Sequence, residues 1–279
     1  MSSITAITLQ DGLKIPAIGF GTYLLKGQSG VESIQTAIET GYRLIDSAFN
    51  YENEGTVGEA IRQSAVGREQ LLITSKLPGR HHSFQKALDT IQESLFRAGL
   101  SYYDLYLIHW PNPLEDQYVE AWQALIEAKK RGLIRSIGVC NFLPEHLERL
   151  KKETGVLPSI NQIEMHPYFN QKAQLKWHQE QGIATEAWSP LGRGNEMLQD
   201  QSIRAIADAH RKSIAQVILR WHIQRGVIPI PKAVSKEHQL ENIRVFDFDL
   251  SDKEMATMDL LTRENGRTHD QDPAVYQEF

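Results

Sequence analysis

The sequence has a single cysteine, no excess of basic residues and no long apolar run, and each absence argues against a class of protein. With Cys140 alone, an intramolecular disulfide is impossible and a cysteine-based metal site is not expected, so we predict no metal. A formal net charge of −5 gives no basic surface for nucleic acid. No segment approaches the ~18 apolar residues of a membrane span, and the N-terminus lacks a signal-peptide pattern. We therefore expect a cytoplasmic protein that binds neither nucleic acid nor membrane.

The chain also lacks any linker-like, low-complexity or charge-rich segment, so we place no domain boundary within its 279 residues. A (β/α)8 barrel takes about 250 residues, and a single domain over residues 1–279 therefore fits the length. The composition, 41% hydrophobic and 23% charged, is typical of a globular domain. Nothing in the sequence indicates a subunit interface, and we expect a monomer.

Strand-like and helix-like patterns alternate along the whole chain. Eight runs rich in Ile, Leu and Val have the character of strands buried on both faces. These runs are residues 18–23, 43–48, 71–77, 103–110, 134–142, 159–166, 183–191 and 227–232. Helical patterns such as 84–98, 119–131 and 214–224 lie between them, and a glycine precedes five of the strands where a helix C′ residue belongs. The alternation predicts an α/β fold, a (β/α)8 TIM barrel.

Three segments depart from the simple repeat. Residues 5–16 alternate around Asp11 and Gly12, which is a hairpin signal. We expect this hairpin to plug the amino-terminal end of the barrel. Two helical segments, 200–210 and 213–225, lie before the eighth strand, one more than the repeat requires. A further helix is expected at the C-terminus.

Polar residues close three consecutive apolar runs. Asp46, Lys76 and His109 are separated by 30 residues (76 − 46) and 33 residues (109 − 76). One βα unit takes about 30 residues, so each step advances by one strand of a parallel sheet. Loops at the carboxyl ends of barrel strands carry active sites. We therefore expect these side chains to meet there, together with Tyr51, five residues after Asp46.

Together these four side chains are suited to protonating a carbonyl oxygen. A tyrosine hydroxyl has an ordinary pKa of about 10, and a nearby Lys76 cation would lower it while Asp46 keeps the lysine charged. His109 would donate a hydrogen bond to the carbonyl oxygen and orient it. The set contains no evident nucleophile, so a hydride from a cofactor is the natural attacking group. The residues predict carbonyl reduction with Tyr51 as general acid.

The motifs around these residues resemble the aldo-keto reductase family over residues 13–261. The matching segments are Gly41–Glu54, Ile73–Lys76, Asp104–Pro111, Ile137–Phe142, Asn161–Glu164, Trp188–Gly192 and Ile230–Lys232. Residues 111–122 and 219–224 are most similar to the prokaryotic branch that includes 2,5-diketo-gluconate reductases and methylglyoxal-reducing enzymes. The resemblance implies reduction of small dicarbonyls, keto-sugars and aromatic aldehydes to alcohols. It also implies NADPH bound across the barrel mouth without a Rossmann domain. In agreement, Gly19 and Gly21 are not followed by the rest of a dinucleotide fingerprint.

The same resemblance implies a set of cofactor contacts. Trp188 would stack on the nicotinamide, and Asn141 and Gln162 would hold its carboxamide. Leu191 and the loop after it would lie along the pyrophosphate. The remaining implied contacts are Gly21, Thr22, Tyr23, Asp46, Cys140 and Ser189 near the nicotinamide half, and Lys232, Ala233, Ser235, His238, Glu241 and Asn242 around the adenosine and its 2′-phosphate.

Three of these positions differ from the family pattern. Relatives usually have serine at the positions of Cys140 and Ala233, and arginine at the position of His238. Arginine holds a phosphate with a fixed fork of donors, whereas neutral histidine offers one donor. We therefore expect NADPH to be preferred through Lys232 and NADH to be accepted as well.

The substrate wall is implied by the resemblance to contain Tyr23, Phe49, Trp110 and Trp188, with His109 at the reacting carbonyl. Many relatives have a tryptophan where this chain has Pro78, and the segments after residues 109, 188 and 261 are short. We expect an open pocket for small aldehydes, dicarbonyls or keto-sugars.

Two other functions stay open from the residues alone. A lysine at a barrel strand end, here Lys76, could form a Schiff base as class I aldolases do. The chain could also be a non-catalytic relative that binds nucleotide as a regulatory subunit.

Overall fold

The computed structural model of the chain describes residues 4–194 and 196–279. Eight parallel strands form one sheet in which each strand is hydrogen-bonded to the next along the chain, from β3 to β10. The strands are β3 (Phe20–Gly21), β4 (Leu44–Asp46), β5 (Leu72–Leu77), β6 (Tyr103–Ile108), β7 (Ile134–Cys140), β8 (Ile160–Glu164), β9 (Ala184–Trp188) and β10 (Val227–Pro229). Each lies inside one of the eight predicted runs, so the predicted strands are confirmed.

Backbone hydrogen bonds between the first and last strands close the sheet into a barrel. The amide nitrogen of Gly19 donates to the carbonyl of Pro229, and that of Gly21 donates to the carbonyl of Pro231, both at 3.0 Å. A Cβ atom on Gly19 would lie 2.6 Å from a methyl carbon of Ile230, so glycine permits this close approach. The predicted (β/α)8 barrel is confirmed.

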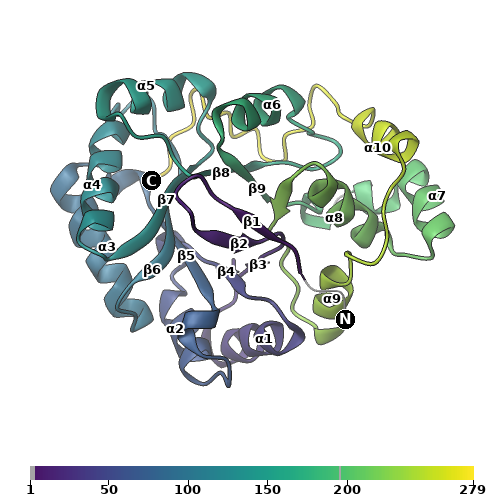
Figure 1. Cartoon of the computed structure of the whole chain (residues 1–279), viewed down its shortest axis with the longest axis horizontal. Helices are drawn as coiled ribbons and strands as arrows, with labels where there is room; N and C mark the ends of the chain where they lie inside the picture. The colour runs from purple at the N-terminus through teal and green to yellow at the C-terminus, as the bar shows by residue number, and fades with distance from the viewer. Residues whose placement is uncertain (1–3, 195) are drawn as a thin grey trace.

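Helices surround the barrel, as Figure 1 shows. They are α1 (Gly27–Thr40), α2 (Glu54–Arg62), α3 (Phe84–Ala98), α4 (Tyr118–Lys130), α5 (Pro144–Thr154), α6 (Lys172–Gln181), α7 (Gln201–His210), α8 (Ile214–Gln224), α9 (Lys236–Ile243) and α10 (Asp252–Asp259). Two of them, α7 and α8, lie between β9 and β10, and α10 follows α9, so the predicted extra helices are confirmed. The side chains of Asp200 and Ser213 cap α7 and α8, which fixes where these two helices begin. Among the described residues, no helix has the length and apolar character needed to cross a membrane.

The predicted hairpin is formed by β1 (Ala6–Thr8) and β2 (Lys14–Pro16), which pair antiparallel. Figure 1 shows it lying across one end of the barrel. Leu9 and Ile15 are buried in the same apolar cluster as Leu44, Leu105 and Ile160 of the barrel strands. The amino-terminal end is therefore closed by apolar packing, as predicted.

Candidate active site

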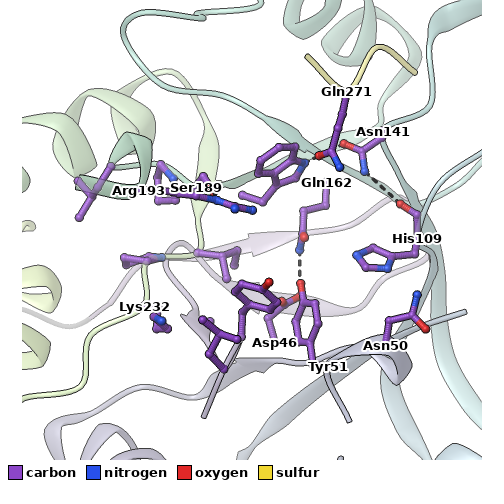
Figure 2. Close-up of a pocket in the computed structure, with 18 of the residues that line it drawn as sticks. Asp46, Asn50, Tyr51, His109, Asn141, Gln162, Ser189, Arg193, Lys232 and Gln271 are labelled. Atoms are coloured by element: carbon purple, nitrogen blue, oxygen red, sulfur yellow. Dashed lines mark hydrogen bonds between the residues drawn. The ribbon is translucent and has the colours of Figure 1, made fainter. Parts of the chain in front are cut away.

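A pocket of about 830 Å³ lies at the carboxyl ends of the strands. Its wall contains residues from the strand ends, from the loop after β9 and from the tail after α10, and Figure 2 shows many of them. Of the residues predicted from the sequence, the wall contains Gly21, Tyr23, Asp46, Tyr51, His109, Trp110, Asn141, Gln162, Trp188, Ser189, Leu191 and Lys232. Most of the predicted site is thus brought together in one cavity.

Lys76 and Asp46 form a buried ion pair beneath the pocket. The strands β4 and β5 are neighbours, and Lys76 Nζ lies 2.6 Å from Asp46 Oδ1 and donates to the carbonyl of Ser47 at 2.7 Å. Lys76 is 0% exposed and Asp46 is 4% exposed. Burial alone would lower the pKa of Lys76, but the charges of Asp46 and Tyr51 outweigh it and the net pKa is raised. The lysine is therefore held as a cation.

Tyr51 lies on the short 3-10 helix η1 (Phe49–Tyr51) that follows β4. Lys76 Nζ is 5.1 Å from the centre of its ring, and the His109 ring centre is 5.8 Å away. Burial raises the pKa of Tyr51 to about 12, although Lys76 acts in the lowering direction. Our prediction of a net lowered pKa was wrong, because the desolvation of the hydroxyl outweighs the lysine charge. At neutral pH the hydroxyl therefore keeps its proton.

The ion pair extends through an amide to a second buried carboxyl group. Gln162 Nε2 donates to Asp46 Oδ2 and to Glu186 Oε2, both at 2.9 Å. Both amide hydrogens are thereby used, and the carbonyl oxygen of Gln162 is the atom left to meet a ligand. Glu186 is 1% exposed, and burial together with the charge of Asp46 raises the pKa of Glu186 to about 8. We did not predict this residue, although a carboxylate in the middle of β9 was a visible signal.

Asn141 joins three strand ends beside the pocket. Its side-chain nitrogen donates to the carbonyl of His109 at 3.0 Å, and its oxygen accepts from Trp188 Nε1 at 2.7 Å. The residue has a left-handed backbone with φ of 62°, which asparagine tolerates better than most residues. The hydrogen bonds orient the indole of Trp188, which forms part of the pocket wall.

The opposite side of the pocket carries positive charge. Figure 2 shows Lys232 and Arg193 on one side and His109 with Asn50 on the other. Lys232 is exposed and, within the part of the chain that the structure describes, forms no ion pair. The Arg193 guanidinium is 6.0 Å from the Trp188 ring centre and 5.8 Å from that of Tyr23. Arg193 was not named individually, but it lies in the loop after Leu191 that was predicted to follow the pyrophosphate.

Several predicted cofactor contacts lie outside the pocket wall. These are Thr22, Cys140, Ala233, Ser235, His238, Glu241 and Asn242. Ser235 caps α9 by accepting from the backbone nitrogen of His238 at 3.3 Å. The last five of these residues therefore lie at or near α9, beyond Lys232, and the structure leaves their predicted role as a prediction.

Two predicted contact residues, Phe49 and Cys140, pack outside the pocket wall. Phe49 is 7% exposed and packs its ring under the Arg97 guanidinium at 4.0 Å, so it does not face the pocket where substrate was expected. Cys140 is 0% exposed and packs in the barrel interior with Leu105 and Leu107. Burial raises the pKa of the Cys140 thiol well above its ordinary value. Cys140 is thus a packing residue beneath the site rather than part of its wall.

The tail after α10 forms a side of the pocket that the sequence did not reveal. Gln271, Tyr276, Glu278 and Phe279 contribute to the wall. The Tyr276 ring centre is 4.4 Å from that of Trp110, which is only 6% exposed as a result. The pocket is therefore more covered than the short tail led us to expect.

The geometry agrees with comparisons against known proteins. The sequence signature described as Aldo/keto reductase family matches residues 17–263. The chain is 46% identical to 2,5-diketo-D-gluconic acid reductase B of Corynebacterium sp. (strain SHS752001), with 100% of both chains covered. It is 45% identical to methylglyoxal reductase DkgA of Escherichia coli (strain K12), covering 91% of this chain and 92% of that protein. The crystal structure of a Gox0644 mutant in complex with NADPH superimposes with a TM-score of 0.94 at 39% identity, covering 99% of this chain and 100% of that one.

Proposed function

The chain belongs to the aldo/keto reductase family, and from that membership we propose that it reduces aldehydes and ketones to alcohols with NADPH. Family membership makes it an NADP-dependent oxidoreductase. The observation that carries the proposed mechanism is the arrangement of Tyr51 and His109, with the buried Lys76–Asp46 pair behind them, at one wall of the pocket.

Tyr51 is proposed to protonate the carbonyl oxygen of the substrate. NADPH, when bound, supplies the hydride that attacks the carbonyl carbon. Because burial holds the pKa of Tyr51 at about 12, its hydroxyl is protonated before the reaction begins. The proton then moves to the oxygen as negative charge develops there, and Lys76 stabilises the phenolate that is left behind. Asp46 keeps Lys76 charged and in place.

His109 is proposed to orient the carbonyl. Its ring lies in the pocket wall, and its centre is 5.8 Å from that of Tyr51. The two side chains can therefore direct donors to one oxygen from two directions, which fixes the carbonyl relative to the attacking group. Trp110 and Tyr23, whose rings also line the pocket, would exclude water from that oxygen.

The residues present fit NADPH in their chemistry. An aromatic surface at Trp188 and the free carbonyl oxygen of Gln162 suit the nicotinamide and its carboxamide. Lys232 and Arg193 supply positive charge for phosphates on the opposite side. Gln162, Trp188 and Lys232 lie at or after the ends of three different strands. A cofactor that contacts all three would lie across the barrel mouth.

The 2′-phosphate is proposed to be held mainly by Lys232. Ala233 and His238 replace the serine and arginine usual in relatives, and this loss of donors should allow NADH to react measurably. Catalytic efficiencies measured with both cofactors test the idea, and His238→Arg should widen the gap. A wild-type efficiency with NADH more than about a thousandfold lower, a difference of roughly 4 kcal/mol, would overturn it.

The substrate class is proposed to be small dicarbonyls, keto-sugars and aromatic aldehydes. The relatives named 2,5-diketo-D-gluconic acid reductase B and methylglyoxal reductase support the first two. Loss of NADPH absorbance with methylglyoxal, a diketo-gluconate and an aromatic aldehyde is the test. Turnover of at least one class is expected, and no turnover of any would contradict the proposed function.

The aldolase alternative has little support from the site. Lys76 is 0% exposed, is absent from the pocket wall and is held as a cation by Asp46, whereas a Schiff base needs an accessible neutral amine. Borohydride treatment with a carbonyl substrate should therefore not label Lys76. The regulatory alternative predicts cofactor binding without turnover, and the same absorbance assay separates it from the proposed reductase.

A further inference from the structure

A carboxylate from the far end of the chain contacts the ring of His109. Glu278, in the tail after α10, is 8% exposed and places Oε1 2.6 Å from His109 Nδ1. These two atoms lie within ion-pair distance but are not aligned as a hydrogen bond, and the ring is charged only when both of its nitrogens carry a proton. The other ring nitrogen, Nε2, makes no hydrogen bond within the described residues, while the ring lies in the pocket wall. Glu278 is thus directly behind the group proposed to meet the substrate.

The loops after three adjacent strands form a receptor for Glu278. Asn50, after β4, donates to Oε1 at 2.8 Å, and the backbone nitrogen of Gly79, after β5, donates to Oε2 at 2.9 Å. Asn112, after β6, donates to the backbone carbonyl of Glu278 at 2.8 Å and accepts from its backbone nitrogen at 3.0 Å. A Cβ on Gly79 would lie 2.3 Å from Asn112 Nδ2, so only glycine leaves room for this clamp. Such a set of contacts fixes both the main chain and the carboxylate of residue 278.

The carboxylate in this receptor is ionised. Burial acts to raise the pKa of Glu278, but His109, the Gly79 amide and Asn50 together outweigh burial and lower it. A second histidine, His82, lies near Glu278, yet burial lowers the pKa of His82 to about 4 and keeps it neutral. Of these two histidines, His109 is therefore the one placed to share a proton with the negatively charged carboxylate.

We propose that Glu278 is a positioning residue that keeps a proton on Nδ1 of His109. A lone pair on Nδ1 would face an anion at 2.6 Å, whereas an N–H there is attracted to it. A neutral ring with its proton on Nδ1 presents a lone pair at Nε2, which repels a carbonyl oxygen. His109 can then donate to that oxygen only as the imidazolium, a charge-assisted donor stronger than a neutral one. The contact of Nε2 with a substrate carbonyl rests on the proposed function. The position of the proton on Nδ1 does not depend on that function.

The groups around the His109 ring leave Glu278 as its charged neighbour. Glu278 and Tyr51 contact the ring directly, and Tyr51 is neutral because its pKa is about 12. His82 interacts with Glu278, but burial lowers the pKa of His82 to about 4 and keeps it neutral. The Lys76 cation lies behind Tyr51 and is paired with Asp46. Among the residues described, Glu278 is thus the one charged side chain in direct contact with the ring.

Nitrogen NMR on the protein without cofactor tests the proton position. With 15N-labelled histidine, and with His109→Asn to assign the signals, the wild type should show His109 protonated at Nδ1 at every pH at which it is folded. As pH rises it should change from the imidazolium to the Nδ1–H form. Glu278→Gln should instead populate the Nε2–H form. Glu264→Gln, which alters an exposed carboxylate of the same tail, is the matched control. A wild-type ring in the Nε2–H form at neutral pH would overturn the proposal.

Kinetics separate positioning from a purely structural role. In the wild type, kcat/KM for carbonyl reduction should fall as pH rises and the imidazolium loses a proton. Glu278→Gln should abolish this pH-dependent fall, and its kcat at acid pH should be about tenfold below the wild-type value. If the tail leaves the receptor in that variant, Asn112→Ala, which removes only the backbone clamp, should change the profile in the same direction by less. Identical pH profiles in wild type and Glu278→Gln would overturn the proposal. An inactive wild type with the expected NMR spectrum would refute the proposed function alone.

Discussion

The two ends of the barrel are built from the same strands but have opposite chemistry. At the amino-terminal end, Leu9 and Ile15 of the hairpin pack on apolar side chains of the barrel interior. At the carboxyl end, the ion pair of Asp46 and Lys76 is almost completely buried, and Glu186 is buried beside it. One end stabilises the fold by apolar burial, while the other keeps charges in a low-dielectric environment where each must be paired.

The contrast indicates that the site depends on stability supplied elsewhere in the molecule. A buried ion pair adds little to stability, yet breaking it costs much, because the remaining charge has no partner. Burial, together with the nearby charge of Asp46, raises the pKa of Glu186 to about 8, which shows how unfavourable a further charge is at this end. Substitutions at the two ends should therefore separate turnover from stability.

Lys76→Met should have the largest effect, because it leaves the charge of Asp46 buried and unpaired. We expect a loss of about 3–5 kcal/mol in the free energy of unfolding, together with loss of turnover. Urea unfolding followed by circular dichroism measures the first, and NADPH consumption the second. Adding Asp46→Asn should restore most of the stability but none of the activity. A stable single variant would contradict the contrast.

Ile15→Ala should have the next largest effect, and only the stability should change. Ile15 is 0% exposed at the closed end, and its truncation should cost about 2–5 kcal/mol. Below its unfolding temperature the variant should keep the kcat/KM of the wild type. A large fall in kcat/KM without unfolding would show that the two ends are coupled.

Glu186→Gln should change how stability depends on pH. The folded-state pKa of Glu186 is about 8 and its ordinary value is 4.5, so the folded protein binds the proton more tightly than the unfolded chain does. Its contribution is fully present below pH 4.5 and is lost as pH rises through 8. Relative to the variant, the wild type should lose up to about 1.4 kcal/mol per pH unit within that window. Parallel stability curves for the two proteins would refute this.

Lys129→Met should have the smallest effect. Lys129 Nζ lies 2.6 Å from Asp11 Oδ2 at the closed end, but the lysine side chain is 36% exposed. Exposed pairs contribute about 0–1 kcal/mol, and the effect should shrink with added salt. A loss comparable with that of Lys76→Met would mean that burial does not explain the difference between the two ion pairs.

The strands and their polar ends could be predicted from the sequence because buried parallel strands are continuous apolar runs, and Asp46, Lys76 and His109 interrupt such runs at one phase of the repeat. Glu278 could not be predicted, since its partners Asn112 and Gly79 are 166 and 199 residues away in the sequence. The βα repeat also does not predict the position of the tail after α10, which contains Glu278.

Side-chain directions and net pKa shifts were the other limits. Phe49 was expected in the substrate wall, but the turn of η1 directs its ring toward Arg97, and spacing alone does not reveal such a rotation. The lysine beside Tyr51 was predicted correctly, yet the net shift of the pKa of Tyr51 depends on how completely packing removes water from the hydroxyl. The degree of desolvation is set by packing in the folded structure and cannot be derived from the residue spacing.

Tyr51→Phe gives the most direct test of the proposed mechanism, since it removes the hydroxyl and leaves the ring. The affinity for NADPH, measured by fluorescence titration, and the free energy of unfolding should stay close to the wild-type values. The kcat for carbonyl reduction should fall at least a thousandfold, a loss of roughly 4 kcal/mol in transition-state stabilisation. A variant that binds NADPH and still turns over within about tenfold of the wild type would show that Tyr51 is not the proton donor.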